Sequence, residues 1–387
     1  MPRSPELSAA ARAIRESIFS RLAGRLAGRA DAVPLHLGDT WLAPPPSARR
    51  ALDAAECRDG APAGEGPLLA RLARKLREQN GLNFVASQHL QVTVGATGAL
   101  AAAARAVLDP GDEMIVPTPH WPLIRGIVTN AGGVPVEAPL TQQLYLDPSA
   151  SAAALIEPMV TPRTAALYLT TPNNPDGKVL TRRQLEELAE LARRHDLWVL
   201  SDEVYEDFSY GAPHVSMASL PGMAERTISV FSLSKSFALA GHRLGYLVAA
   251  EAPMRALRKI VNHTVYNVPA ALQELALALY DDAATARWLD EARRAYLSAR
   301  NAASARLPVR HPLPDGATYL FVDLSKFCGP DGIWPLVERL LDAGVSLSPG
   351  EQFGRGFERH ARICFTAVEL GRVLSGIDRI AEILVEK

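Results

Sequence analysis

Short apolar runs alternate with longer intervals through the first two thirds of the chain, and this alternation restricts the fold more than any other feature. Most intervals have room for a helix, and one over 181–195 has an N-cap residue in Thr181. Strands that alternate with helices predict a mostly parallel seven-stranded sheet covered on both faces, and so an α/β fold. The predicted strands are 91–94, 113–117, 134–137, 165–170, 197–201, 227–231 and 244–249.

Beyond these strands, long helical stretches are expected over about 252–306, followed by a smaller α+β unit from about 307 to the end. The proline-containing stretch Ala43-Pro44-Pro45-Pro46 marks the expected crossing between a smaller and a larger domain. No internal repeat or low-complexity tail is found.

Composition excludes several classes of function. The chain has 387 residues, 48% of them hydrophobic, and a formal net charge of −1, so no bulk charge attracts it to nucleic acid or membranes. Three cysteines, Cys57, Cys328 and Cys364, are too few and too scattered for a disulfide framework or a zinc site. Because no apolar leader or long uncharged run is found, we expect a cytoplasmic protein. We also expect no bound metal.

The chemistry begins at Lys235, which follows the last residues of a predicted strand in Phe231-Ser232-Leu233-Ser234-Lys235. A lysine placed there can form a Schiff base with the aldehyde of pyridoxal 5′-phosphate (PLP). Arg243, eight positions later, and Ser232 can hold the cofactor phosphate. The string alone is also compatible with a solvent-facing lysine in a serine-rich loop.

Other strand ends carry matching residues. Asn174 lies in the turn after the strand 165–170, and Asp202 and Tyr205 follow the strand 197–201. A strand, a glycine turn and an alanine-rich helix start at 92–100, where backbone N–H groups and the helix dipole favour a phosphate. The expected phosphate contacts are Ala96, Thr97 and Gly98.

With these segments in order, the chain resembles the class I/II aminotransferases of PLP fold type I, from Gly38 to Arg362. In this family's arrangement Asp202 favours the protonated pyridine nitrogen, and Asn174 and Tyr205 donate to the phenolic oxygen. The resemblance implies that Trp121 stacks on the cofactor ring, and that Arg362 and Gly38 face the substrate carboxylate.

The resemblance also implies the domain division and the assembly. The N-terminal segment should fold back onto the C-terminal part, giving a large cofactor domain over 47–285 and a small domain from 1–46 and 286–387. A homodimer is expected, because the family's cofactor sites lie at the subunit interface.

One position departs from the family. Where many members carry a tyrosine that reaches the neighbouring subunit's phosphate, this chain has Asp59, in Arg58-Asp59-Gly60. A carboxylate would be repelled by a phosphate dianion. Asp59 either makes a surface salt bridge or turn contact, or pairs with a cationic substrate side chain, as the short likeness to capreomycidine-synthase-like members implies.

Three functions follow. The favoured one is a PLP-dependent aminotransferase that moves the α-amino group of an L-amino acid to a 2-oxo acid through Lys235. The alternative is an eliminating or cyclising PLP enzyme acting on a β-substituted basic amino acid, with Asp59 as its indication. A DNA-binding regulator is disfavoured, because few residues precede Gly38. The side-chain pocket is expected near Thr40, Trp41, Tyr266 and Asn267.

Overall fold

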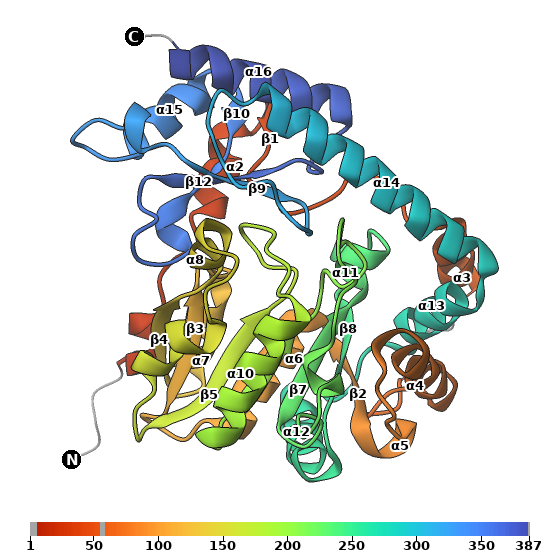
Figure 1. Ribbon diagram of the computed structural model, residues 1–387. Coiled ribbons are helices and arrows are strands. Elements are labelled where there is room, and N and C mark those ends of the chain that lie inside the picture. The colour runs from red at the N-terminus through yellow and green to blue at the C-terminus, as the bar shows by residue number, and fades with distance from the viewer. Residues whose placement is uncertain (1–5, 55–58, 386–387) are drawn as a thin grey trace.

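The computed structural model describes residues 6–54 and 59–385, so Cys57, Arg58 and residues 1–5 lie outside the described residues. A seven-stranded sheet of order β2-β8-β7-β6-β5-β3-β4 forms its centre (Figure 1). Only β8 runs antiparallel to its neighbours, which confirms the predicted mostly parallel sheet. The strands are β2 Leu90–Val94, β3 Glu113–Thr118, β4 Val134–Pro139, β5 Thr164–Thr170, β6 Trp198–Asp202, β7 Thr227–Ser232 and β8 Leu244–Val248.

Helices cover both faces because side chains alternate along buried strands. In β5, Ala166 and Tyr168 pack against one helical layer, and Leu167 and Leu169 against the other. The first layer contains α6 (Gly95–Val107), α7 (Leu123–Asn130) and α12 (Glu251–Thr264). The second contains α8 (Thr141–Leu146), α9 (Ala152–Ile156) and α10 (Arg182–Arg194).

The predicted helix over 181–195 is confirmed as α10, and its start has a clear local cause. The Thr181 hydroxyl accepts from the Gln184 N–H, and the Gln184 side chain accepts from the Thr181 N–H. This capping box satisfies two backbone donors that the helix itself leaves unpaired. The α10 axis is thereby fixed directly after the turn that carries Asn174.

A further group of helices packs at the β2 end of the sheet. Leu72 and Leu76 of α4 (Gly66–Asn80) share a buried cluster with Leu275 and Leu279 of α13 (Ala270–Asp281). The shorter helices α3 (Pro46–Ala54) and α5 (Ala86–His89) lie in the same region, since α3 contacts α13 and α5 contacts α4.

The two ends of the chain build a smaller α+β unit together (Figure 1). β1 (Val33–Pro34) pairs in parallel with β10 (Val345–Ser346), and β9 (Tyr319–Asp323), β12 (His360–Cys364) and β11 (Ser348–Pro349) form an antiparallel sheet. Their core includes Leu22 and Leu35 from the N-terminal segment. The helices are α1 (Ala9–Ala13), α2 (Phe19–Leu26), α15 (Trp334–Asp342) and α16 (Leu370–Val385).

α14 (Ala283–Arg306) runs from α13 to the smaller unit (Figure 1). Its residues Ala292, Tyr296, Ala299 and Ala303 belong to the core of the smaller unit, whereas α13 packs beside the large sheet. This packing supports the division expected from the sequence, and we propose 47–285 as the large domain and 1–46 with 286–387 as the small domain.

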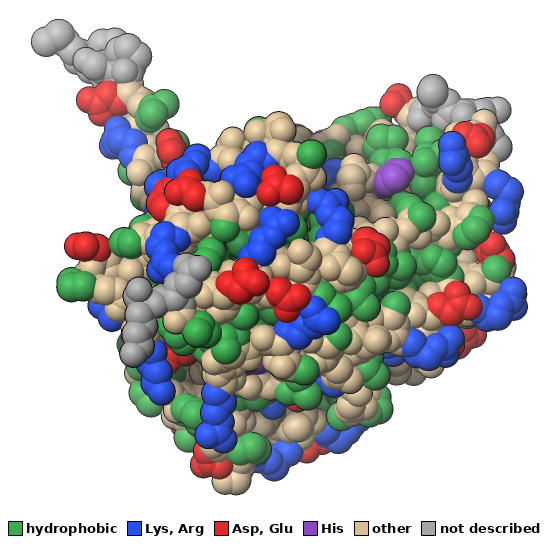
Figure 2. All heavy atoms as spheres, turned by 90° about the horizontal axis from the view of Figure 1, so that it is seen from above, with side chains coloured by type: hydrophobic (Ala, Val, Ile, Leu, Met, Phe, Trp, Pro, Cys, Tyr) green, Lys and Arg blue, Asp and Glu red, His purple; other side chains and the backbone are tan. Residues whose placement is uncertain are grey.

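Surface charges are mixed. Figure 2 shows acidic and basic side chains interspersed over the face seen from above, in keeping with a formal net charge of −1. Among the described residues, none of the helices is both long enough and apolar enough to pass through a lipid bilayer.

Gly245 provides a test of how closely β8 packs against the first turn of α6. A Cβ atom at Gly245 would lie 2.6 Å from the Phe231 carbonyl oxygen and 3.0 Å from the Ala96 nitrogen. We expect Gly245→Ala to lower the free energy of unfolding by about 1–3 kcal/mol, because backbone must shift to admit the methyl group. Thermal unfolding measures this, with Gly241→Ala as the control, since no atom lies within 4 Å there. Equal melting temperatures for the two variants would contradict the expectation.

Candidate active site

A cavity of about 400 Å³ opens where β5, β6 and β7 end and the smaller unit meets the sheet. Parallel strands place their carboxyl ends at one edge, so residues distant in the sequence converge there. Most residues predicted for the site line this cavity: Gly38, Ala96, Thr97, Trp121, Asn174, Asp202, Tyr205, Ser232, Lys235, Arg243 and Arg362.

Lys235 projects from α11 (Leu233–Ser236), the short helix that follows β7. The Ser232 hydroxyl caps this helix by accepting from the Ser234 N–H at 3.1 Å. The Lys235 ammonium donates a hydrogen bond to the carbonyl oxygen of Gly38. The lysine therefore bridges the end of the large sheet and the N-terminal segment inside the cavity.

Arg243 lies beside the first turn of α6. Its Nη1 donates to the Ala240 carbonyl at 2.8 Å, and its Nη2 would lie 2.8 Å from a Cβ at Gly95. The absent side chain at Gly95 therefore leaves room for the guanidinium next to the N-terminus of a 13-residue helix. The helix N–H groups at Ala96 and Thr97, together with this cation, suit a phosphate dianion.

Asp202 is a buried carboxylate at the end of β6. Its Oδ2 accepts from the Tyr168 hydroxyl at 2.8 Å, and its Oδ1 accepts weakly from the Val204 N–H at 3.4 Å. Burial raises the pKa of this carboxyl to about 6, and among the described residues it forms no ion pair. A group in this state gains from a cation placed beside it, and a protonated pyridine nitrogen is such a cation.

Tyr205 meets a tyrosine that sequence reasoning did not identify. Its hydroxyl lies 2.6 Å from that of Tyr319 at the start of β9, and the rings meet edge to face at 5.8 Å. A Cβ at position 38 would collide with the Tyr319 hydroxyl, so a glycine is required there. Tyr319 thus joins Tyr205 of the large sheet to Gly38 of the N-terminal segment.

Arg362 is 3% exposed, and the part of the chain that the structure describes gives it only neutral partners. Its Nη1 donates to the Asn174 Oδ1 at 2.9 Å, its Nη2 donates to the His36 carbonyl at 2.8 Å, and its Nε has no hydrogen-bond partner. The guanidinium also lies 4.3 Å from the Tyr319 ring. A buried cation without a counter-ion is prepared for an anionic ligand, and a carboxylate matches its fork.

His36 is a second residue that the sequence reasoning missed. It lines the cavity, is 1% exposed, and its Nδ1 lies 2.6 Å from the Ser346 hydroxyl, while Nε2 has no hydrogen-bond partner. Burial and the nearby charge of Arg362 lower the pKa of His36 to about 4. The imidazole is therefore neutral at physiological pH. Its contact with Ser346 depends on pairing between β1 and β10, which no local pattern indicates.

Six predicted residues do not line the cavity: Gly98, Trp41, Asp59, and also Thr40, Tyr266 and Asn267, near which the sequence predicts the side-chain pocket. Gly98 follows Ala96 and Thr97 in the first turn of α6. Trp41 packs with its ring edge against Tyr296 of α14 at 5.5 Å. Asp59 is exposed ahead of α4, outside the cavity of its own chain.

A second buried network supports the turn between Asp202 and Tyr205 from behind. Glu203 accepts from Ser201, Ser216 and His214 at 3.0, 2.9 and 2.8 Å. Glu206 pairs with Lys75 at 2.5 Å. Glu203, Glu206 and His214 bring ligand atoms within 4.8 Å of one another. Glu203 and Glu206 are thus bound by protein side chains, and we interpret the group as structural.

The cavity thus combines a lysine, a buried carboxylate without a counter-ion, an anion site at a helix start and a buried arginine. Each feature fits one part of PLP or of an amino acid: the aldehyde, the ring nitrogen, the phosphate and the substrate carboxylate. Fold and site together define a PLP-dependent enzyme of amino acids.

Comparisons with known proteins identify the family. The model of aminotransferase class I and II matches residues 34–380. A probable aspartate/prephenate aminotransferase of Thermus aquaticus is 34% identical, covering 87% of this chain and 86% of its own. An arginine–pyruvate transaminase of Pseudomonas aeruginosa is 36% identical, covering 78% and 76%. The chain belongs to the aminotransferase class I and II family, and its activity is that of a PLP-dependent aminotransferase.

Solved structures agree with this assignment. A Thermus thermophilus aspartate aminotransferase with maleate superposes with a TM-score of 0.90 at 32% identity, covering 98% of this chain and all of its own. A Pyrococcus protein superposes at 0.92 with 31% identity, covering 97% and 98%. The predicted PLP fold type I is confirmed.

The low pKa of His36 predicts a specific pH dependence. Between about 4 and 6.5 the unfolded imidazole binds a proton that the folded one does not, so stability falls as the pH drops through this window. We expect the melting temperature of His36→Gln to fall less than that of the wild type between pH 6.5 and 4. Other acid-sensitive groups act equally in both proteins. Parallel melting curves across the window would show that His36 titrates normally.

Proposed function

We propose that the cavity residues carry out transamination of an L-amino acid whose α-carboxylate is bound by Arg362. The observation that supports this most strongly is the Arg362 guanidinium, buried with neutral partners and oriented through the Asn174 Oδ1 at 2.9 Å. A bidentate carboxylate satisfies such a fork. With the carboxylate there, the α-carbon of the substrate comes close to Lys235, on the same cavity.

In this proposal, the cofactor is held at its aldehyde, its ring and its phosphate. Lys235 would bind it covalently through the ε-amine, Asp202 would face its ring nitrogen, and Arg243 with the start of α6 would hold its phosphate. Trp121 would stack on the ring, and Tyr205 would donate to its phenolic oxygen. Once bound, PLP supplies an electron sink for the pair left behind when the Cα–H bond breaks.

Lys235 then moves the proton. With cofactor and substrate in place, the neutral ε-amine of Lys235 would accept the Cα proton as a general base. Its present hydrogen bond to the Gly38 carbonyl keeps it on the substrate side of the cavity. Asp202 remains ionised once the ring cation is beside it, because that charge lowers the carboxyl pKa. Over the full reaction the amino acid would give its amino group to a 2-oxo acid and be released as a 2-oxo acid itself.

We further propose that the substrate side chain is uncharged. Among the described residues that line the cavity, the lysine and arginines are Lys235, Arg243 and Arg362, and each has a place with the cofactor or the α-carboxylate. His36 is neutral because its pKa is about 4. A second substrate carboxylate therefore lacks a cation among the described residues of the cavity. Phe19 and Leu37 line the remaining space with apolar surface.

The cyclising alternative needs an anion for a basic side chain. Asp202 is the carboxylate among the described lining residues, and it is assigned to the cofactor ring. Asp59 is exposed and outside its own chain's cavity, so the cation-pairing role gains no support from the geometry of a single chain. Transamination remains the proposal.

We propose a cytoplasmic homodimer as the working form. Val265 and Tyr266, at the end of α12, are 46% and 55% exposed, although they are large apolar residues. Tyr266 also adopts a left-handed φ of 70°, which a tyrosine rarely does without a constraint. Contact with a second copy would cover both side chains.

The covalent role of Lys235 is testable directly. We expect Lys235→Ala to lose turnover and the visible absorbance of covalently bound cofactor, because the remaining side chains contain no amine at that place. Borohydride reduction should fix the cofactor on the protein. Mass spectrometry should then find it on the wild-type peptide that contains Lys235 and on no peptide of the variant. Cofactor found on another lysine of the wild type would refute the assignment.

The substrate class is testable with a panel of amino acids, each with pyruvate or 2-oxoglutarate. We expect kcat/KM for leucine or phenylalanine to exceed that for aspartate or arginine by about tenfold or more, since a buried unsatisfied polar group costs about 1–3 kcal/mol and an unpaired charge costs more. Preference for aspartate or arginine would contradict the uncharged pocket. A dehydrated or cyclised product formed without any 2-oxo acid would instead support the alternative function.

A further inference from the structure

The turn that carries Asn174 contains a carboxylate that does not enter the cavity. Asp176 lies two residues after Asn174, is 3% exposed and does not line the site. The turn itself closes through the Asn173 N–H, which donates to the Lys178 carbonyl at 2.8 Å, and through the Gly177 N–H, which donates to the Asn173 carbonyl at 2.9 Å. Asp176 therefore lies inside a closed loop, next to Asn174, which is the hydrogen-bond partner of Arg362.

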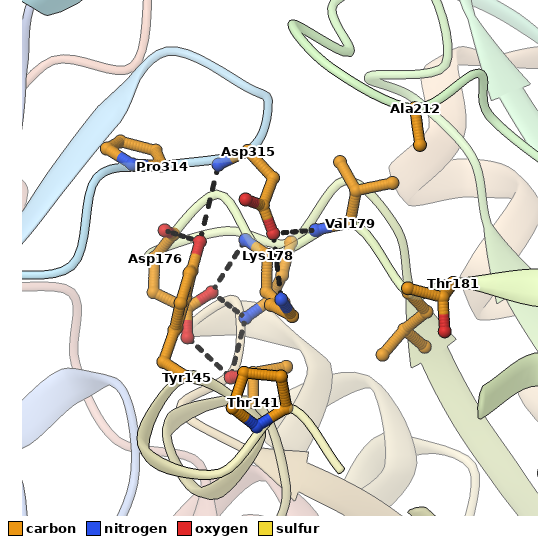
Figure 3. A network of polar contacts seen from close by, with 12 residues as sticks. Thr141, Tyr145, Asp176, Lys178, Val179, Thr181, Ala212, Pro314 and Asp315 are labelled. Carbon is orange, nitrogen blue, oxygen red and sulfur yellow. Dashed lines mark hydrogen bonds and ion pairs between the residues drawn. The ribbon is translucent and has the colours of Figure 1, made fainter. Parts of the chain in front are cut away.

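Four donors converge on the Asp176 carboxylate, and Figure 3 shows the contacts from Thr141 and Lys178. Oδ1 accepts from the Asn173 Nδ2 at 2.8 Å and from the Lys178 N–H at 3.1 Å. Oδ2 accepts from the Thr141 hydroxyl at 2.5 Å and from the Gln142 Nε2 at 3.2 Å. The Lys178 N–H is a fixed donor, and the Asn173 amide is oriented by its second bond to the Pro119 carbonyl, so Oδ1 faces two donors that require an acceptor.

A cation does not explain this carboxylate. The nearest candidate, the Lys178 ammonium, pairs instead with Asp315 at 2.9 Å and lies 4.5 Å from the Tyr145 ring. Figure 3 shows Lys178 directed to Asp315, on the side of the turn away from Thr141. Asp176 is therefore held by hydrogen bonds alone among the described residues, and burial raises the pKa of its carboxyl.

Two site residues depend on this arrangement. The Asn173 amide that donates to Asp176 also donates to the Pro119 carbonyl at 3.0 Å, and Pro119 lies two residues before Trp121. Asn174 follows Asn173 directly and accepts from Arg362. One carboxylate thus fixes the backbone that presents Asn174 and, through Asn173, the segment that presents Trp121.

We propose that Asp176 is a positioning residue for the reaction: its carboxyl group fixes Asn174, and through it Arg362, in the orientation that binds the substrate α-carboxylate. This inference rests on the proposed role of Arg362. It adds a residue that touches neither cofactor nor substrate and that acts through the Asn173–Asn174 turn.

The test compares Asp176→Asn with Asp315→Asn. An amide at 176 offers one acceptor oxygen where the carboxylate has two, so the four donors lose one acceptor, and we expect KM for the best amino acid to rise about tenfold or more. The visible circular dichroism of the bound cofactor should change as well, because the Trp121 segment shifts. Asp315→Asn removes the ion pair on the outer side of the same turn and should leave KM and the cofactor signal within about twofold of the wild type.

Thr141→Val deletes one donor and keeps the carboxylate, and it carries the test if Asp176→Asn does not fold. Its KM should rise severalfold. The inference would be overturned if Asp176→Asn had a lowered melting temperature but wild-type KM and cofactor signal. The same result in Thr141→Val would overturn it if that variant carries the test. Equal effects in Asp315→Asn would also overturn it. Wild-type protein that fails to transaminate any amino acid would refute the proposed function instead, so the two failures are distinguishable.

Discussion

Two opposite charges are buried in one cavity without being paired with each other, and the rest of the site is organised around them. The Asp202 carboxylate lies at the end of β6, and the Arg362 guanidinium on β12 has only neutral partners among the described residues. Each would be costly to bury alone. The cofactor ring and the substrate carboxylate supply the missing counter-charges, so ligand binding relieves a cost that folding incurs.

Neutral groups hold these charges in place. Tyr168 donates to Asp202, while Asn174 and the His36 carbonyl accept from Arg362. Hydrogen bonds orient a side chain without neutralising it, which leaves its full charge for the ligand. Asp176, outside the cavity, is also held by hydrogen bonds from neutral groups. Its four donors fix it within the turn that carries Asn174.

Local sequence carried much of this structure. The strands predicted around Tyr168, Leu200 and Val230 were found within one or two residues of their observed bounds, because buried parallel strands have a strong apolar signal. Lys235, Asp202 and Arg243 stood out by motif. The roles of His36, Tyr319 and Asp176 were not visible, since they arise from contacts between segments far apart in the chain, such as His36 with Ser346. In the sequence, Asp176 is an ordinary turn residue, and nothing local indicates its four hydrogen-bond donors.

The pairing of β1 with β10 has a consequence for the order of assembly during synthesis. Val33 can pair with Val345 only after the residues between them have been synthesised. Until then, Leu22 and Leu35 lack their core, and Gly38 cannot be held against Tyr319. The large sheet lies earlier in the chain and is able to form first. The nascent chain is therefore able to form most of its cofactor site before its substrate-binding residues are in place.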